Sequence, residues 1–434
     1  MVLQLLCLAF LIAAAGACLY YVLLAFCGIC LRDGGDGQDA EAVHTFAVVI
    51  PAHDEEGTLR ASLDSCAALD YPAEKFRVFV VADNCGDRTA DVARAAGVAC
   101  LERYDPTRRG KGFALEWAFA QVLPQGYDAV VVLDADCRLD RHALHAFNGR
   151  LSAGDRVLQA SYVASNPDAS VTSYAVAVGN VLENELFYAP KSRLGLAVFL
   201  RGTGMVLHRE VLARHPWDAR SVVEDTEYSL RLMRAGQPVR FLRSVLVCSA
   251  FPHRWAELRV QRTRWAGNMR FGRRQALCLL AEGLARGQPL LIDAGWTLGV
   301  LSRPLVLLQL LAAVLLAGVG AWLVPGAVSS ALLGAALALA ALQATYFTLG
   351  VALLGLNRGR LALLARSPLV VLQLVGIAVA GTLRRGAGEW ARTPRAFEPG
   401  PGPTPDACWQ GDKSGRRGER RRVVESETGL LRNL

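Results

Sequence analysis

Residues 129–137, with the sequence Ala-Val-Val-Val-Leu-Asp-Ala-Asp-Cys, decide the fold of this chain. Ala129 to Leu133 is a short apolar run without Gly or Pro, which predicts a buried parallel strand. Asp134 and Asp136 follow at its C-terminal end, and that edge of an open α/β sheet is where ligands bind. Because side chains two residues apart lie on the same side of an extended chain, the two carboxylates can hold one divalent cation, Mg²⁺ or Mn²⁺. An ordinary acidic turn after a strand would have the same sequence, so the other motifs must decide between a metal site and a turn.

The segment around this strand alternates strands and helices. We expect strands at 45–50 and 77–82 and helices at 58–69 and 113–122. This alternation predicts an α/β domain over residues 45–255, with a mixed, mainly parallel sheet covered on both faces. A dinucleotide-binding domain would show G-x-G-x-x-G after its first strand, but this chain has Pro-Ala-His-Asp-Glu-Glu-Gly at 51–57. A nucleotide at this edge would therefore be bound by other contacts.

Three further motifs follow in order along the domain. Lys111 lies in a basic, glycine-flanked loop before a helix, where the helix dipole favours phosphate, although a solvated basic loop has the same composition. Phe199–Met205 is an apolar stretch with two glycines, which let a backbone approach a ligand closely. Glu224 and Asp225 begin a helix at 226–235, where acids also serve as ordinary helix caps.

The last motif is Gln261-Arg262-Thr263-Arg264-Trp265, within a helix predicted at 256–288. Spacings of three and four residues place Gln261, Arg264 and Trp265 on one helical face. The same helix carries several other arginines among apolar residues. That pattern is typical of an amphipathic helix lying on an anionic membrane surface.

The composition predicts a membrane protein, because 53% of the 434 residues are apolar. Residues 1–31 form an uncharged run that we interpret as an uncleaved transmembrane anchor, followed by a polar linker at 32–44. Two transmembrane helices are expected within 289–357. We expect 358–395 to be an interfacial or short membrane segment, because its apolar part, 367–383, has only about 17 residues and a span needs ~20. Residues 396–434 are predicted to form a basic, disordered cytoplasmic tail.

Charge and cysteine usage narrow the class of partner. The net charge of +8 is concentrated near the membrane segments and in the tail, which favours an anionic membrane surface rather than nucleic acid. The 11 cysteines lack zinc-type spacing. The arginines after 383 predict a cytoplasmic tail at a cell membrane, and we expect the globular domain on the same side. A transporter is disfavoured, because the apolar runs carry few ionisable residues and no paired halves.

The ordered set of motifs resembles the membrane-bound glycosyltransferases of family 2, and in particular their cellulose, chitin and hyaluronan synthase branch. The matching elements are Asp83 after the second strand, Asp134-Ala-Asp136, Glu224-Asp225, and Gln261-x-x-Arg264-Trp265. The resemblance covers about 180 residues. It implies a GT-A fold and inverting transfer of a sugar from a nucleotide-sugar donor, with UDP as the expected nucleotide, to a glycan or lipid-linked acceptor.

The resemblance also implies a role for each matching residue. Asp225 would be the general base, and Asp134 and Asp136 would hold the nucleotide and its metal ion. Asp83 would contact the base or ribose. Arg264 would lie near the diphosphate and Trp265 near the acceptor sugar. The remaining residues expected to line the substrate site are Glu55, Lys111, Glu224 and Gln261.

Two departures from the family pattern concern the acceptor. Val223 stands where relatives often have Thr, and the loop Leu200-Arg-Gly-Thr-Gly204 replaces a Phe-Phe-Cys-Gly-Ser type of sequence. A growing polysaccharide and a single addition to a membrane lipid, of the ceramide or polyprenyl phosphate type, therefore both stay open. A polymer synthase needs enough helices for a channel, which this chain could also supply as a homo-oligomer.

Overall fold

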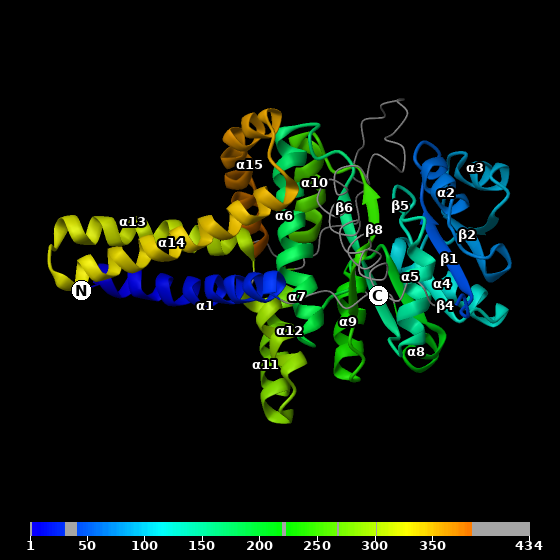
Figure 1. Cartoon of the computed structure of the whole chain (residues 1–434), viewed down its shortest axis with the longest axis horizontal. Helices are drawn as coiled ribbons and strands as arrows, with labels where there is room; N and C mark the ends of the chain where they lie inside the picture. The colour runs from blue at the N-terminus through cyan, green and yellow to red at the C-terminus, as the bar shows by residue number, and fades with distance from the viewer. Residues whose placement is uncertain (1, 31–40, 219–222, 267–268, 301, 384–434) are drawn as a thin grey trace, which may run out of the picture.

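The computed structural model describes residues 2–30, 41–218, 223–266, 269–300 and 302–383 of the 434-residue chain. An α/β domain lies at one end, a bundle of long helices projects from the other, and several helices pack between them (Figure 1). The predicted tail at 396–434 and most of the linker at 32–44 lie outside the described residues.

One eight-stranded sheet forms the α/β domain, in the order β3-β2-β1-β4-β7-β6-β8-β5. The first four strands in that order are parallel to one another, whereas β7 is antiparallel to both β4 and β6, and β5 is antiparallel to β8. The predicted mixed, mainly parallel sheet is confirmed. The strands are β1 (Phe46–Ala52), β2 (Phe76–Asp83), β3 (Ala99–Arg103), β4 (Ala129–Val132), β5 (Arg138–Leu139), β6 (Val157–Ala164), β7 (Met205–His208) and β8 (Arg240–Ser249).

Helices cover both faces of the sheet, because the central strands are apolar on both sides. In β4, Ala129 and Val131 pack into one hydrophobic core, and Val130 and Val132 pack into the other. The first core contains residues of α2, α3 and α5, and the second contains residues of α4, α6, α8 and α9. These helices are α2 (Leu59–Ala67), α3 (Thr89–Ala95), α4 (Lys111–Val122), α5 (Ala143–Ser152), α6 (Val171–Glu183), α8 (Arg209–Arg214) and α9 (Glu224–Arg234).

The central position of β4 explains why the acidic motif matters. It pairs in parallel with β1, and β1 pairs in parallel with β2, so the C-terminal ends of the three strands meet at one edge. Asp134 follows β4 and Asp83 ends β2, and both therefore emerge at that edge. We call it the carboxyl edge of the sheet.

Short helical segments join the sheet to the membrane helices. A single turn of π-helix, η3 (Asn184–Tyr188), continues α6 into α7 (Ala189–Arg193). Three more helices follow the sheet: α10 (Trp255–Ala266), α11 (Met269–Arg286) and α12 (Pro289–Val300). The last two pack against each other as a hairpin, which extends away from α15 in Figure 1. The predicted helix at 256–288 therefore corresponds to α10 and α11, and residues 267–268 between them are not described.

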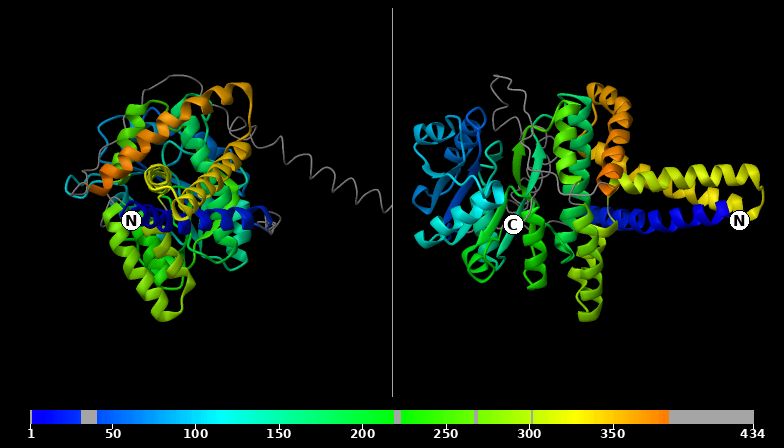
Figure 2. Two further views of the ribbon diagram at one scale, coloured as in Figure 1. Left: turned by 90° about the vertical axis from the view of Figure 1, so that its left-hand side faces the viewer. Right: turned by 180° about the vertical axis from the view of Figure 1, so that it is seen from behind.

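Four helices in the described part of the chain are long and apolar enough to cross a membrane: α1 (Val2–Cys30), α13 (Arg303–Leu323), α14 (Ala327–Leu354) and α15 (Arg358–Leu383). The first three contact one another and run side by side in the right view of Figure 2, whereas α15 lies across their direction and packs on α6 and α10. The prediction for 358–395 took 367–383 as its apolar part, which is shorter than the helix in the structure. Helix α15 begins at Arg358 and continues through Pro368, so residues 358–366, which are mostly apolar but include three arginines, extend it beyond the 367–383 run. Its crosswise direction fits the predicted interfacial position, which stays a prediction.

Candidate active site

Lys111, Asp134 and Gly202 meet at the carboxyl edge of the sheet. Gly110 precedes α4 with a φ of 117°, and Lys111 begins the helix. The Lys111 Nζ donates to the Asp134 carboxylate and, over 2.7 Å, to the carbonyl oxygen of Gly202. The backbone N–H of Asp134 donates to the Thr203 hydroxyl over 3.1 Å. The predicted basic loop and the glycine-broken stretch are thus brought directly onto the acidic motif.

Asp225 approaches the same glycine, Gly202, as Lys111 does. Gly202 has a φ of 79°, and a Cβ there would lie 3.1 Å from Lys111 Nζ and 3.4 Å from Asp225 Oδ2. The other carboxylate oxygen, Oδ1, accepts from the backbone N–H of Thr226 over 2.6 Å. A side chain at position 202 would therefore fill the space that Lys111 and Asp225 share, which explains why glycine is needed there.

Electrostatics distinguish these groups from ordinary helix caps. Burial raises the pKa of the Glu224 carboxyl, and the charge of Asp225 adds to the shift, to about 8. Burial likewise raises the pKa of Asp225, while Lys111 opposes the shift in both carboxyls. Burial alone would lower the pKa of Lys111, but Asp134, Glu224 and Asp225 together raise it. Perturbed groups gathered around one point are typical of a catalytic site.

Asp136 completes a group that fits a divalent cation. Ligand atoms of Asp134, Asp136 and Cys137 lie within 4.8 Å of one another. Both carboxylates are half-buried, but the expected extended chain is wrong here: β4 ends at Val132, and the backbone N–H of Cys137 donates to the carbonyl oxygen of Asp134 over 2.9 Å, so a turn brings the two acids together. Two carboxylates at the end of a strand provide the oxygen ligands that Mg²⁺ and Mn²⁺ prefer.

Asp83 is buried at the end of β2, where it has a partner that the sequence analysis missed. Its carboxylate accepts from the guanidinium of Arg103, the last residue of β3, and from the Asn84 side chain over 3.0 Å. Arg103 also donates to Asp105 and to the carbonyl oxygen of Arg108, so it ties the basic loop to the sheet edge. The sequence signal for this partner was a charged residue, Arg103, at the C-terminal end of the strand that follows β2.

Glu55 lies in the loop after β1, with local contacts at the start of α2. Its backbone N–H donates to the Thr89 hydroxyl over 2.8 Å, and its carboxylate accepts from Thr58. These contacts support the loop rather than bring Glu55 to Lys111 or Asp225. Its assignment to substrate binding stays a prediction.

Gln261, Arg264 and Trp265 all lie in α10, as predicted for one helix. Gln261 is half-buried. The side chains of Arg264 and Trp265 lie outside the described part of the structure. Their expected positions near the diphosphate and the acceptor sugar therefore stay predictions.

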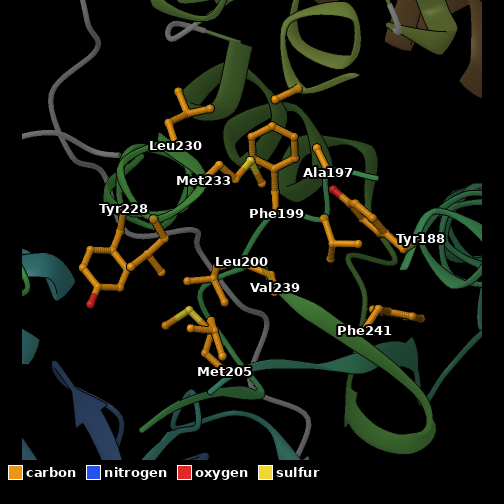
Figure 3. Packing of buried hydrophobic residues seen from close by; sticks show 14 of the residues in the cluster. Tyr188, Ala197, Phe199, Leu200, Met205, Tyr228, Leu230, Met233, Val239 and Phe241 are labelled. Atoms are coloured by element: carbon orange, nitrogen blue, oxygen red, sulfur yellow. The ribbon is translucent and has the colours of Figure 1, made fainter. Parts of the chain in front are cut away.

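The stretch that carries Gly202 is held by packing on its N-terminal side. Phe199 and Leu200 lie among Met233, Val239 and other apolar side chains between α9 and β8 (Figure 3). The backbone N–H of Leu200 donates to the Ser229 hydroxyl, which itself donates to the carbonyl oxygen of Asp225. The same few residues thus position Gly202 and the helix end that presents Asp225.

Comparisons with known proteins identify the family of this chain. A sequence profile described as "Glycosyltransferase like family 2" matches residues 44–268. The probable glycosyltransferase YdaM of Bacillus subtilis (strain 168) is 26% identical over 233 residues, which are 51% of this chain and 54% of that protein. The UDP-forming cellulose synthase 1 catalytic subunit of Komagataeibacter xylinus is 26% identical over 253 residues, which are 57% of this chain and 33% of that protein. The matches thus span about half and one third of these relatives.

A solved structure extends the likeness to the fold. The mannosyltransferase PcManGT from Pyrobaculum calidifontis, in complex with GDP-Man and Mn²⁺, superposes with a TM-score of 0.56 at 19% identity, covering 88% of this chain and 99% of that one. The fold is therefore of the GT-A type, as the sequence predicted. Because the profile covers more than half of the chain and contains the whole carboxyl edge, this protein belongs to glycosyltransferase family 2.

Proposed function

We propose that this protein transfers a hexose from a nucleoside-diphosphate sugar to a glycan or lipid-linked acceptor at the cytoplasmic face of the cell membrane. Asp225 acts as the general base that removes the proton of the acceptor hydroxyl. Asp83, Lys111 and Asp134 line the donor side. UDP is the expected nucleotide, because one relative is named as UDP-forming, and GDP is the competitor, because PcManGT is described with GDP-Man.

The observation that carries this proposal is the space around Gly202. Lys111 Nζ and Asp225 Oδ2 both border the position that a Cβ of residue 202 would take, at 3.1 and 3.4 Å. A cation on the donor side and a carboxylate on the acceptor side thus face one small volume. Lys111 suits negative charge that develops on a departing diphosphate, and Asp225 suits a hydroxyl proton.

A divalent cation would be held by Asp134 and Asp136. When bound, it would stabilise the negative charge of the leaving diphosphate. Lys111, which already donates to Asp134, would fix the orientation of that carboxylate. We expect Gln261 and Arg264 to add contacts to the donor from α10.

The proposed stereochemistry follows from the number of carboxylates on the acceptor side. Asp225 is assigned as base, and no residue of this site is assigned as a nucleophile. One base without a covalent intermediate corresponds to direct displacement and inversion at the anomeric carbon. An α-linked donor would then give a β-linked product.

A donor screen tests the proposal. Purified protein in lipid nanodiscs is incubated with Mn²⁺ and radiolabelled UDP-glucose, UDP-N-acetylglucosamine or GDP-mannose, and the products are identified by mass spectrometry. We expect one UDP-sugar to be consumed with release of UDP. Consumption of GDP-mannose alone would contradict the nucleotide assignment, and consumption of no nucleotide sugar would contradict the function.

A second candidate is a single transfer to a membrane lipid. It is favoured by the small number of candidate spans, four among the described residues, of which α15 lies across the other three. Product length separates the two candidates. A ladder of increasing mass means a polysaccharide synthase, whereas a single sugar on an organic-extractable lipid means the single transfer.

A further inference from the structure

A cluster of charged side chains lies between the carboxyl edge and the membrane helices, and the proposed reaction does not use it. Arg201 precedes Gly202 in the chain. Its Nη2 lies 3.4 Å from Glu183 Oε2, at the end of α6, and its Nη1 donates to Asn184 Oδ1 over 2.6 Å. The guanidinium carbon lies 5.8 and 5.6 Å from the ring centres of Tyr162 and Tyr188.

Arg303 reaches the same place from the first turn of α13. Its Nη1 donates to the carbonyl oxygen of Gly179, one helical turn before Glu183, over 2.7 Å. Its Nε is buried and has no hydrogen-bond partner within the described residues. A buried guanidinium N–H without an acceptor costs free energy, and an oxygen-rich anion would remove that cost.

Arg262 joins the cluster from α10, the helix that carries Gln261. Burial lowers the pKa of Arg262, and the charges of Arg303 and Arg201 lower it further, whereas Glu183 raises it. Burial alone would raise the pKa of the Glu183 carboxyl, but Arg201, Arg303 and Arg262 together lower it. Among the described residues, three guanidinium groups therefore act on one carboxylate. We call these four side chains the arginine cluster.

Two tyrosines connect the arginine cluster to the reaction site. The Tyr162 ring lies near Arg201, and its hydroxyl shares a hydrogen bond with Ser249. Burial raises the pKa of Tyr162, and the nearby Cys137 and Asp136 add to the shift. Burial also raises the pKa of Tyr188, where Glu183 and, more weakly, Asp225 contribute. The arginine cluster is thus adjacent to both the metal carboxylates and the proposed base, on the side of the membrane helices.

We propose that the arginine cluster binds the phosphate group of a lipid-linked glycan acceptor, whose sugar hydroxyl is the group that Asp225 deprotonates, so that the acceptor is a phosphate-linked membrane lipid rather than a neutral one. This inference rests on the proposed function. Guanidinium groups pair with phosphate in bidentate geometry, and a phosphate would balance the excess of positive charge. The lipid tail would leave along α13, because Arg303 begins that helix. A ceramide-type acceptor has no group for this cluster.

Binding of defined probes tests the proposal in the full chain. The protein is placed in nanodiscs of phosphatidylcholine and saturated with UDP and Mn²⁺, so that a phosphate cannot bind at the donor site. Farnesyl phosphate, farnesol and inorganic phosphate are then titrated by calorimetry. We expect farnesyl phosphate to bind at least about tenfold more tightly than farnesol, the size of one charged hydrogen bond.

Variants assign the binding to the arginine cluster. Arg303→Gln and Arg201→Gln should each weaken farnesyl phosphate binding by about tenfold or more. Arg360→Gln is the matched control, because Arg360 lies in the first turn of α15 but pairs with Asp168. Glu183→Gln should bind farnesyl phosphate several-fold more tightly, because the competing carboxylate is neutral. A merely structural cluster would not give this gain.

The outcomes separate this proposal from the proposed function. Equal affinity for farnesyl phosphate and farnesol overturns the phosphate site, and so does unchanged affinity in Arg303→Gln and Arg201→Gln. Inorganic phosphate that displaces farnesyl phosphate with equal affinity overturns the lipid source. Failure of UDP and Mn²⁺ to bind the wild type contradicts the proposed function instead. If Arg201→Gln does not fold, Arg201→Lys keeps the charge and should retain part of the affinity.

Discussion

The carboxyl edge of the sheet and the junction with the membrane helices use charge differently. At the carboxyl edge, Asp134, Lys111 and Asp225 are half-buried, and the pKa values of Lys111 and Asp225 are shifted. At the junction, Lys191 is fully buried, and it pairs over 2.8 Å with Asp293 of α12. Asp293 also accepts from the backbone N–H of Ala197 and from Tyr20 of α1, 273 residues away.

This difference suggests that the carboxyl edge serves the reaction and that the junction serves stability. The carboxyl edge gathers charged groups with shifted pKa values around Gly202, which suits chemistry. The buried Lys191–Asp293 pair also hydrogen-bonds to Thr297, Ala197 and Tyr20, and it joins α7, α12 and α1 to the stretch that leads to Gly202. Variants at the edge should therefore affect rate, and variants of this pair should affect stability.

The largest effect is expected for Asp225→Asn at the carboxyl edge. Removing a general base costs about 10² to 10⁴-fold in rate. Binding of UDP, measured by calorimetry, should stay near wild type, because the base acts on the acceptor. Glu227→Gln, in the same turn of α9, is the matched control and should keep activity. If UDP binding disappears together with activity, Asp225 belongs to the donor side and the assignment is wrong.

The next effect concerns the metal. Asp136→Ala should lower transfer by about 100-fold or more and abolish its dependence on Mg²⁺ or Mn²⁺, because a bound cation supplies several kcal/mol of charge stabilisation. Excess chelator should have the same effect on the wild type and little further effect on the variant. Asp91→Asn, on the surface of α3, serves as the control. Full turnover of the wild type in chelator would contradict the metal site.

Changes to the Lys191–Asp293 pair should lower stability rather than the rate of transfer. Lys191→Met leaves a buried carboxylate without its cation, which costs about 3–5 kcal/mol of stability. Thermal unfolding in detergent should show this loss, while UDP binding to the remaining folded protein stays near wild type. Arg60→Met removes the Arg60–Asp64 pair, in which both side chains are about 60% exposed, and should cost at most about 1 kcal/mol. Equal decreases in unfolding temperature in the two variants would contradict a stabilising role for the Lys191–Asp293 pair.

The sequence predicted the carboxyl edge well because local rules govern it. A buried strand followed by Asp-x-Asp places both acids at its C-terminal end, although a turn rather than the expected extended chain brings them together. Parallel pairing brings the ends of β1, β2 and β4 to one edge. Lys111 was found because a glycine-flanked cation precedes a helix. Arg103 was missed, because its role depends on which strand lies beside β2, and a single sequence does not state that order.

The junction could not be predicted, because its contacts join segments far apart in the chain. Nothing near Lys191 in sequence points to Asp293, and nothing near Glu183 points to Arg303. The apolar run at 367–383 was started after Arg366, whereas the helix α15 includes that arginine and begins at Arg358. Three-dimensional packing, rather than any local pattern, decides these features.

The smallest effect is a shift in the pH profile of Lys111→Gln. Burial raises the pKa of Asp225, and the positive charge of Lys111 partly offsets that rise. The base must be deprotonated to act, so activity increases as pH rises through its pKa, and the acidic limb of the wild type should lie above the ordinary Asp value of about 3.9. Removing the cation raises the pKa further. The acidic limb of kcat/KM in Lys111→Gln should therefore move to higher pH.

Measurement of kcat/KM from acidic to alkaline pH, at saturating Mn²⁺, checks this sign. Saturating metal is needed because Lys111 also donates to Asp134, and a change in metal affinity would otherwise mix with the titration. Lys111→Arg keeps the charge and should keep the wild-type limb, even where its absolute rate is lower. A limb that stays in place or moves to lower pH in Lys111→Gln would mean that Lys111 does not act on the base. The cation would then serve the donor alone, and the two sides of Gly202 would be electrostatically independent.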